Sequence, residues 1–244
     1  MSSENVVIGR DLARLPVADW SACLPALPPD DHAHEPATGA RLGVLAPVPL
    51  HAAPGTPPVA ELPAVISPEV RTWLPVIGGQ PGWVHVLVPC APDGRTGWVE
   101  LGPDVLVVAH LVHLVVDIGE RTVTLHHGRS AQSWHCEFGE RWPFRATVGW
   151  PCGVGNATHP TPRGRTFVLG DVHPRTGVVD HALLLAAHMP THLGHGAGVE
   201  AVGVHTWPSA SWGSAGTDGS LVVPPEAMPV LTEVARPGTA VLIH

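Results

Sequence analysis

The residues best suited to chemistry lie near the C-terminal end of the chain. His205 ends an apolar run, a Gly- and Ser-rich loop follows, and the stretch Thr217-Asp218-Gly219-Ser220 leads towards a predicted helix. Nucleophiles often lie at such positions, because Gly permits a tight turn and successive backbone N–H groups can stabilise an oxyanion. A serine hydroxyl needs a base to take its proton. His, Ser and Asp this close together are also common in ordinary loops, so the spacing alone is a weak signal.

The elements that must position these residues are mostly β-strands. From Leu42, short apolar runs alternate with turn residues, which predicts a small β-barrel. From Leu111 the pattern stays β-rich: residues 111–118 and 121–127 predict a hairpin, and further strands are predicted over 166–172, 182–188, 201–205 and 239–244. After Leu111, only 224–235 predicts a helix, because Met228, Leu231 and Val234 recur at i, i+3 and i+6.

Composition excludes several functions. The 13 cationic residues are all Arg, and the absence of Lys excludes a Walker-type phosphate loop and Schiff-base chemistry. A net charge of −8 argues against nucleic-acid binding.

The first 20 residues lack a cationic segment followed by an apolar one, so no secretory signal is expected. The longest nearly apolar run, 105–116, is too short for a bilayer, which needs about 20 residues. No transmembrane segment and no cofactor are predicted.

Cysteine and histidine offer two further possibilities. The four cysteines are scattered without a C-x-x-C pair, so neither a zinc knuckle nor a disulfide framework is indicated. Cys136 or Cys152 is an alternative nucleophile, since Cys152 follows a turn that could border a cleft. The spacing of His188, His192 and His195 could serve a metal ion. The glycines around the last two leave ordinary loop histidines as the other interpretation.

Several motifs occur together in the order typical of one family. The strand pair His113–Gly128, the strand end Ala146–Gly149 and the final strand Gly238–Ile243 resemble elements of the L,D-transpeptidase (YkuD-like) catalytic domain. Thr161–Phe167 resembles its T-P-x-G-x-F element with one residue inserted, and Val202–His205 resembles its I-x-I-H-G segment. Residues 82–101 resemble the SH3-like domain that precedes this catalytic domain in many members.

The resemblance implies a mainly β protein with three parts. Residues 1–41 would be a Pro-rich N-terminal extension, 42–108 an SH3-like β-barrel module, and 109–244 an L,D-transpeptidase-like β-sandwich domain with one helix near the C-terminus. It also implies a location outside the cytoplasm, whereas the N-terminal sequence favours the cytoplasm. The expected partner is a peptidoglycan stem peptide or a peptide-like small molecule.

The family's S-H-G-C-I-R motif falls on Thr217–Val222, with marked departures. The family's Cys nucleophile is replaced by Ser220, its motif His by Asp218, and its motif Arg by Val222. The resemblance implies that His205 is the base. Asp218 is then a candidate to orient the imidazole in a Ser-His-Asp arrangement, and the backbone N–H groups of Gly219 and Ser220 are the expected oxyanion donors.

Other residues near this motif are expected to contact substrate. They are Thr206, Trp207, Trp212, Thr217 and His188. The sequence thus predicts acyl transfer or hydrolysis on peptidoglycan-type peptides through a serine. Two alternatives stay open: a catalytically inactive homologue that binds cell wall or peptide, and a cytoplasmic acyltransferase acting on a small amino-acid-like metabolite.

Overall fold

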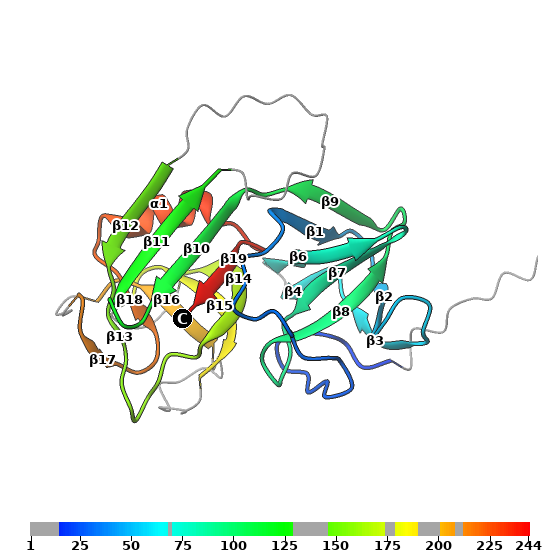
Figure 1. Ribbon diagram of the computed structural model, residues 1–244, viewed down its shortest axis with the longest axis horizontal. Coiled ribbons are helices and arrows are strands. Elements are labelled where there is room, and N and C mark those ends of the chain that lie inside the picture. Colours follow the sequence, from blue (N-terminus) through cyan, green and yellow to red (C-terminus); the bar gives the residue numbers. More distant parts are fainter. Residues whose placement is uncertain (1–14, 68–69, 129–145, 174–178, 190–200, 208–211) are drawn as a thin grey trace, which may run out of the picture.

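The protein is mainly β, as predicted, with a short helix near the C-terminus (Figure 1). The computed structural model describes residues 15–67, 70–128, 146–173, 179–189, 201–207 and 212–244. Within these residues most strands belong to two large sheets, which lie side by side. No helix in the described part is long and apolar enough to cross a bilayer.

The first sheet lies within residues 40–109 and has the strand order β3-β2-β8-β7-β6-β1-β9. Its strands are β1 Ala40–Val44, β2 Val48–His51, β3 Pro58–Leu62, β6 Trp73–Gln80, β7 Trp83–Val88, β8 Arg95–Glu100 and β9 Val105–Ala109. A separate short pair comprises β4 Val65–Ser67 and β5 Val70–Arg71. All the pairings in this sheet are antiparallel. The SH3-like identity of this sheet and the three domain limits stay predictions.

The second sheet has the order β12-β11-β10-β19-β14-β15-β16-β18. Its strands are β10 Val112–Asp117, β11 Thr122–His127, β12 Ala146–Pro151, β14 Gly164–Val172, β15 Ala182–His188, β16 Ala201–His205, β18 Leu221–Val222 and β19 Ala240–Ile243. A small parallel pair joins β13 Val154–Gly155 to β17 Ala215–Thr217. The predicted hairpin is confirmed as β10 and β11, and the last strand, β19, inserts parallel to β10.

The predicted helix is confirmed with a later start, as α1 Ala227–Val234. Pro229 is the third helical residue, where a backbone N–H has no partner inside the helix, so proline removes no helical hydrogen bond there. Met228 and Leu231 are buried in the core of the second sheet. This apolar face, rather than capping, attaches the helix, since no side chain caps its N-terminus.

Strands β14 and β15 are buried on both faces. Phe167 and Leu169 of β14 pack into the core of the first sheet, while Val168 between them packs into the core of the second. β15 repeats the pattern, with Ala186 on the first side and Leu185 on the second. Successive side chains of a strand point to opposite faces, so one strand can serve two cores. The two sheets therefore share apolar packing.

A buried ion pair ties the N-terminal segment to the second sheet. Arg165 of β14 donates from Nε and Nη2 to the two carboxylate oxygens of Asp30, over 2.9 and 2.7 Å. Its Nη1 reaches the carbonyls of Glu35 and Pro36. The Arg165 and Asp30 side chains are 4% and 3% exposed. A bidentate pair with the remaining donors satisfied is the arrangement that makes burial of two charges tolerable.

Candidate active site

The turn that carries Ser220 is held by its own side chains. Thr217 Oγ1 donates to the carbonyl of Ser220 over 2.6 Å and accepts from the N–H of Gly219 over 3.2 Å. The N–H of Ser220 donates to Asp218 Oδ1 over 3.0 Å. Gly219 has φ +110°, and a Cβ there would lie 3.3 Å from the carbonyl oxygen of Pro160. The turn therefore requires glycine at this position.

A second support for the turn comes from a residue to which the sequence assigned no role. Thr161 Oγ1 donates to the carbonyl of Gly219 and accepts from the N–H of Gly155, both over 2.9 Å. Thr161 is 5% exposed. The position of Thr161 in the T-P-x-G-x-F element was the one sequence feature that could have pointed to a role. Its contact with Gly219 could not be predicted, because the two residues are 58 positions apart. The hydroxyl of Thr161 thus links the Ser220 turn to the backbone at Gly155, in a different part of the chain.

His205 ends β16, and Ser220 directly precedes the neighbouring strand β18. β16 and β18 are parallel, with Val204 opposite Leu221, so the end of β16 lies beside the start of β18. A methyl group at Gly203 would lie 3.3 Å from His205 Cδ2 and 3.7 Å from Ser220 Oγ. Both side chains therefore border the small space over the Cα of Gly203, which lies inside the protein, since Ser220 is 3% exposed. No hydrogen bond joins them within the described part of the chain.

The ring of His205 is oriented by a backbone carbonyl. His205 Nδ1 lies 2.8 Å from the carbonyl oxygen of Thr206. A carbonyl oxygen can only accept, so Nδ1 carries the proton. In the neutral ring, Nε2 is then the basic nitrogen. The His205 atom nearest the position of a Gly203 methyl group is Cδ2, to which Nε2 is bonded, and Nε2 itself lies more than 4 Å from that position. The Nδ1–H tautomer is the one that a general base requires.

The structure corrects two expected roles in this turn. Asp218 was expected to orient His205, but its Oδ1 accepts from the N–H of Ser220, and the acceptor at His205 Nδ1 is Thr206. The N–H groups of Gly219 and Ser220 were expected to face an oxyanion, but both donate inside the turn. Short polar side chains commonly bond to the backbone two residues on, and Thr217 and Asp218 both do so.

Three more residues that were predicted to contact substrate lie within the described part of the structure. Trp207 is 42% exposed, and the centroid of its ring lies 6.1 Å from that of the His205 ring. Trp212 is 45% exposed. The hydroxyl of Thr217 is engaged within the turn, which gives this residue a structural role. Of the three, Trp207 is thus the one that the structure places against His205.

His188 is held away from the site, in contacts between the two halves. Its Nδ1 and backbone N–H lie 2.5 and 2.8 Å from the carboxylate of Asp93, and its ring stacks on Trp20 with the centroids 3.8 Å apart. Ala182 at one end of β15 pairs with His205, while His188 is at the other end. Six strand residues span roughly 20 Å. His188 therefore lies away from Ser220 and His205, and a contact between His188 and substrate stays a prediction.

The alternative nucleophiles and the metal hypothesis have mixed outcomes. Cys152 is fully buried, and this burial raises its pKa to about 12. A thiol of that pKa holds almost no thiolate near neutral pH, so Cys152 is excluded as the nucleophile. Cys136, His192 and His195 lie outside the described residues, so a role for them stays a prediction.

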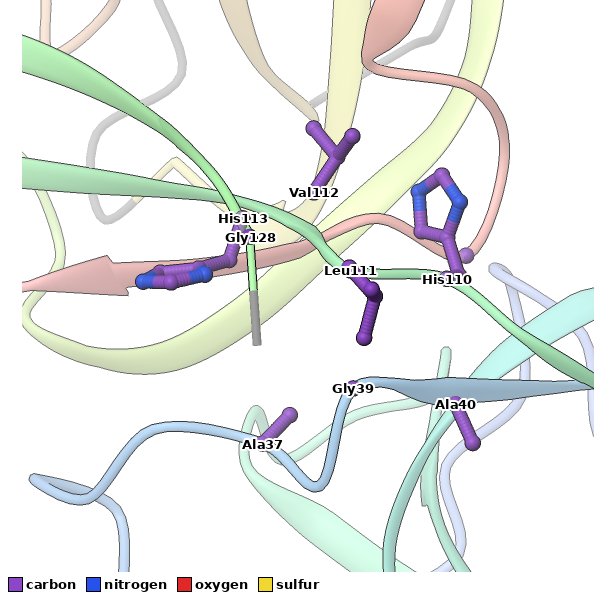
Figure 2. A pocket seen from close by; sticks show the side chains of 9 residues that line it. Ala37, Gly39, Ala40, His110, Leu111, Val112, His113 and Gly128 are labelled. Carbon is purple, nitrogen blue, oxygen red and sulfur yellow. The ribbon is translucent and has the colours of Figure 1, made fainter. Parts of the chain in front are cut away.

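Two hollows in the described structure lie between the sheets rather than at Ser220. One is a small crevice between the start of β1 and the start of β10, where His110, Leu111 and His113 face Ala37 and Gly39 (Figure 2). The other is a groove of about 210 Å³ around the Asp30–Arg165 pair. Both follow from how the two halves meet, and neither contains His205 or Ser220.

Comparison with protein-family models finds no match, and comparison with curated proteins finds none either. Among solved structures, the chain is similar to L,D-transpeptidase 3 from Mycobacterium tuberculosis in complex with a faropenem-derived adduct, with 15% identity and a TM-score of 0.41 over 95% of this chain and 94% of that one. It is also similar to an L,D-transpeptidase from Mycobacterium smegmatis, with 15% identity and a TM-score of 0.39 over 66% of this chain and 90% of that one. A third similar structure is an L,D-transpeptidase from M. tuberculosis H37Rv, with 18% identity and a TM-score of 0.40 over 63% of this chain and 73% of that one.

Proposed function

We propose that the protein transfers or hydrolyses an acyl group at an amide carbonyl, with Ser220 as the nucleophile and His205 as the base. The observation that supports this proposal is the position beside Gly203, which Ser220 Oγ and His205 Cδ2 both border, together with the Nδ1–H tautomer of His205. Apo geometries are often looser than the reactive complex. The proposal requires side-chain rotation that brings the Ser220 hydroxyl and His205 Nε2 together in the substrate complex.

The proposed reaction has two steps, acylation of Ser220 and then deacylation. Ser220 Oγ attacks the carbonyl carbon while His205 Nε2 takes the hydroxyl proton. The tetrahedral intermediate expels the amine, which receives that proton from the imidazolium and leaves an ester on Ser220. A second amine or a water molecule then attacks the ester carbonyl, again losing its proton to Nε2, and Ser220 Oγ leaves as the hydroxyl. The Thr206 carbonyl stabilises the imidazolium at Nδ1 throughout.

The proposed substrate class is a peptidoglycan-type stem peptide. Support comes from the sequence motifs of 113–128, 161–167 and 202–205, which resemble the L,D-transpeptidase family. Trp207 adds an apolar surface beside His205, against which a peptide backbone could pack. The replacement of the family's motif Arg by Val222, which is buried, favours a substrate that needs no cationic partner at this position.

A binding protein without turnover is the second candidate, and one observation favours it. The N–H of Ser220 is bonded to the Asp218 carboxylate and the N–H of Gly219 to Thr217. Without free donors, a developing oxyanion is poorly stabilised, and loss of one such donor costs roughly 10²–10³ in kcat. The surface around His205 and Trp207 would then bind a stem peptide without cleaving it.

Intact-mass analysis of the full chain separates these two functions. We expect incubation with a stem tetrapeptide, or with a fluorophosphonate probe, to add one acyl or phosphonyl group to the wild-type chain and none to Ser220→Ala. Ser214→Ala, in the same loop, is the matched control and should label like the wild type. Equal labelling of Ser220→Ala would overturn the proposal. Binding of the chain to purified sacculi with no adduct on any variant would establish the second candidate instead.

A further inference from the structure

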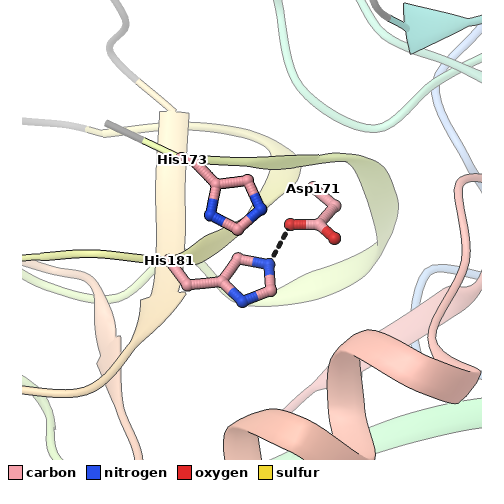
Figure 3. A group of neighbouring side chains, drawn as sticks. All are labelled: Asp171, His173 and His181. Carbon is pink, nitrogen blue, oxygen red and sulfur yellow. Dashed lines mark hydrogen bonds and ion pairs between the residues drawn. The ribbon is translucent and has the colours of Figure 1, made fainter. Parts of the chain in front are cut away.

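The β14–β15 hairpin brings three metal-ligating side chains together on one face. Asp171 pairs with Leu183 and Val172 with Ala182, so the next pair outwards is His173 opposite His181. Asp171 and His173 are two residues apart and therefore share a face of the strand, and directly opposite residues also share a face. Figure 3 shows the result: the carboxylate of Asp171 and the two imidazoles converge.

The observed contacts match what a cation site needs. The ligating atoms of Asp171, His173 and His181 all lie within 4.8 Å of one another, and the group is partly open to solvent. His181 Nε2 contacts Asp171 Oδ1, and the two imidazoles stack with centroids 4.2 Å apart. His173 Nδ1 lies 3.2 Å from the carbonyl oxygen of Asp180. That bond assigns the proton to Nδ1, leaves Nε2 free as a ligand, and is the typical second contact of a metal-bound histidine.

We propose that Asp171, His173 and His181 bind a divalent cation of the zinc type. The cation would link the end of β14 to the start of β15. Two imidazoles and one carboxylate suit Zn²⁺ and similar first-row ions, with a further position for water. Bond lengths of about 2.0–2.2 Å place tetrahedral ligand atoms roughly 3.4 Å apart. Binding would bring the ligand atoms, which lie within 4.8 Å of one another, to this separation by rotation of the three side chains.

The cation would have a structural role, distinct from the proposed chemistry at Ser220. Ala182 pairs with His205, and Ala182 and His181 are successive residues, so their side chains point to opposite faces of the sheet. The bound ion would therefore not contact Ser220 or His205. It would link β14 and β15 beside the end of β16, and so fix the edge of the sheet from which His205 projects. This inference does not depend on the function proposed above.

Isothermal titration of the metal-free full chain with Zn²⁺ tests the site. We expect one strong site per chain. Asp171→Asn and His181→Gln are nearly isosteric and partly exposed, and each should weaken binding at least tenfold. Visible absorption of the Co²⁺ form gives an independent measure, because it reports ligand number and geometry without any activity.

The controls separate this site from the other histidines. His113 and His126 also stack, with centroids 4.8 Å apart, but belong to no three-ligand group among the described residues. His126→Gln should bind Zn²⁺ like the wild type, and so should the double variant His192→Ala/His195→Ala. Unchanged affinity in Asp171→Asn and His181→Gln would overturn the proposal. So would a loss confined to the double variant, or no binding by the wild type.

Discussion

Asp218 Oδ1 accepts a hydrogen bond from the backbone N–H of Ser220, over 3.0 Å. This contact places a negative charge next to the proposed nucleophile, and it uses the donor that an oxyanion would need. A triad acid promotes catalysis, whereas a carboxylate in this position opposes the build-up of negative charge on the substrate oxygen. Whether removal of the Asp218 charge raises or lowers the reactivity of Ser220 therefore distinguishes these two roles.

We expect Asp218→Asn to raise the rate of Ser220 acylation severalfold. The amide oxygen of Asn can still accept from the N–H of Ser220, so the turn is preserved while the charge is removed. The measurement is the rate of fluorophosphonate labelling followed by intact mass, with Ser220→Ala as the blank. If Asp218 acted as a triad acid, the same variant would instead lose reactivity by orders of magnitude.

We expect Gly203→Ala to slow labelling of Ser220 at least tenfold. The added methyl group lies 3.3 Å from His205 Cδ2 and 3.7 Å from Ser220 Oγ, so it fills the space through which the two groups must approach. Gly216→Ala is the matched control, because a methyl group there meets nothing within 4 Å. Normal labelling of Gly203→Ala would show that Ser220 reacts without help from His205.

We expect Arg165→Met to lower the free energy of unfolding by about 3–5 kcal/mol. The variant retains most of the side-chain volume but leaves the Asp30 carboxylate buried without its partner, which is the costly case. Urea denaturation measures the change. Arg163→Met, an exposed neighbour, should stay within about 0.5 kcal/mol of the wild type. Similar losses in both variants would mean that the ion pair contributes nothing specific.

We expect stability to fall as the pH drops from about 6.5 towards 4, in part through His110. Burial, with smaller effects of Arg41 and His127, lowers the pKa of His110 from 6.5 to about 4. Its Nε2 donates to Thr239 Oγ1, which itself donates to the carbonyl of Arg236. Between these pH values the unfolded chain binds a proton at this site that the folded chain excludes, so acid favours unfolding.

The His110 contribution amounts to at most about 3 kcal/mol, since one pKa unit corresponds to about 1.4 kcal/mol. His110→Gln retains a donor for Thr239 but cannot be protonated. Its unfolding free energy, measured by denaturation at pH 7 and at pH 4.5, should therefore fall less across this interval than that of the wild type. An identical pH dependence in the two proteins would contradict the prediction.

Elements with a local pattern could be predicted from the sequence. The alternation of Val and Thr gave the β10–β11 hairpin, and the spacing of Met228 and Leu231 gave α1. The strand end at His205 and the turn at Gly219 were also readable, because apolar runs and glycines mark such points. Local patterns were sufficient wherever neighbours in sequence determine the conformation.

Features that depend on distant partners could not be predicted. His188 lies at the expected strand end, but its partner Asp93 is 95 residues away. Asp218 was placed in the correct turn, yet its bond to Ser220 rather than His205 depends on side-chain direction. The meeting of Asp171, His173 and His181 depends on the register of β14 and β15, which shifts between Val168 and Gly170. No periodicity in one strand reports such a shift.

The two-sided burial of β14 and β15 limits how the molecule can be divided. A fragment cut ahead of β10 would retain Ser220 and His205 but would turn Phe167, Leu169 and Ala186 towards water. Such a fragment would expose an apolar patch that is buried in the intact chain, and it would tend to self-associate. Any minimal unit able to support chemistry at Ser220 therefore has to include the N-terminal half as a folding partner.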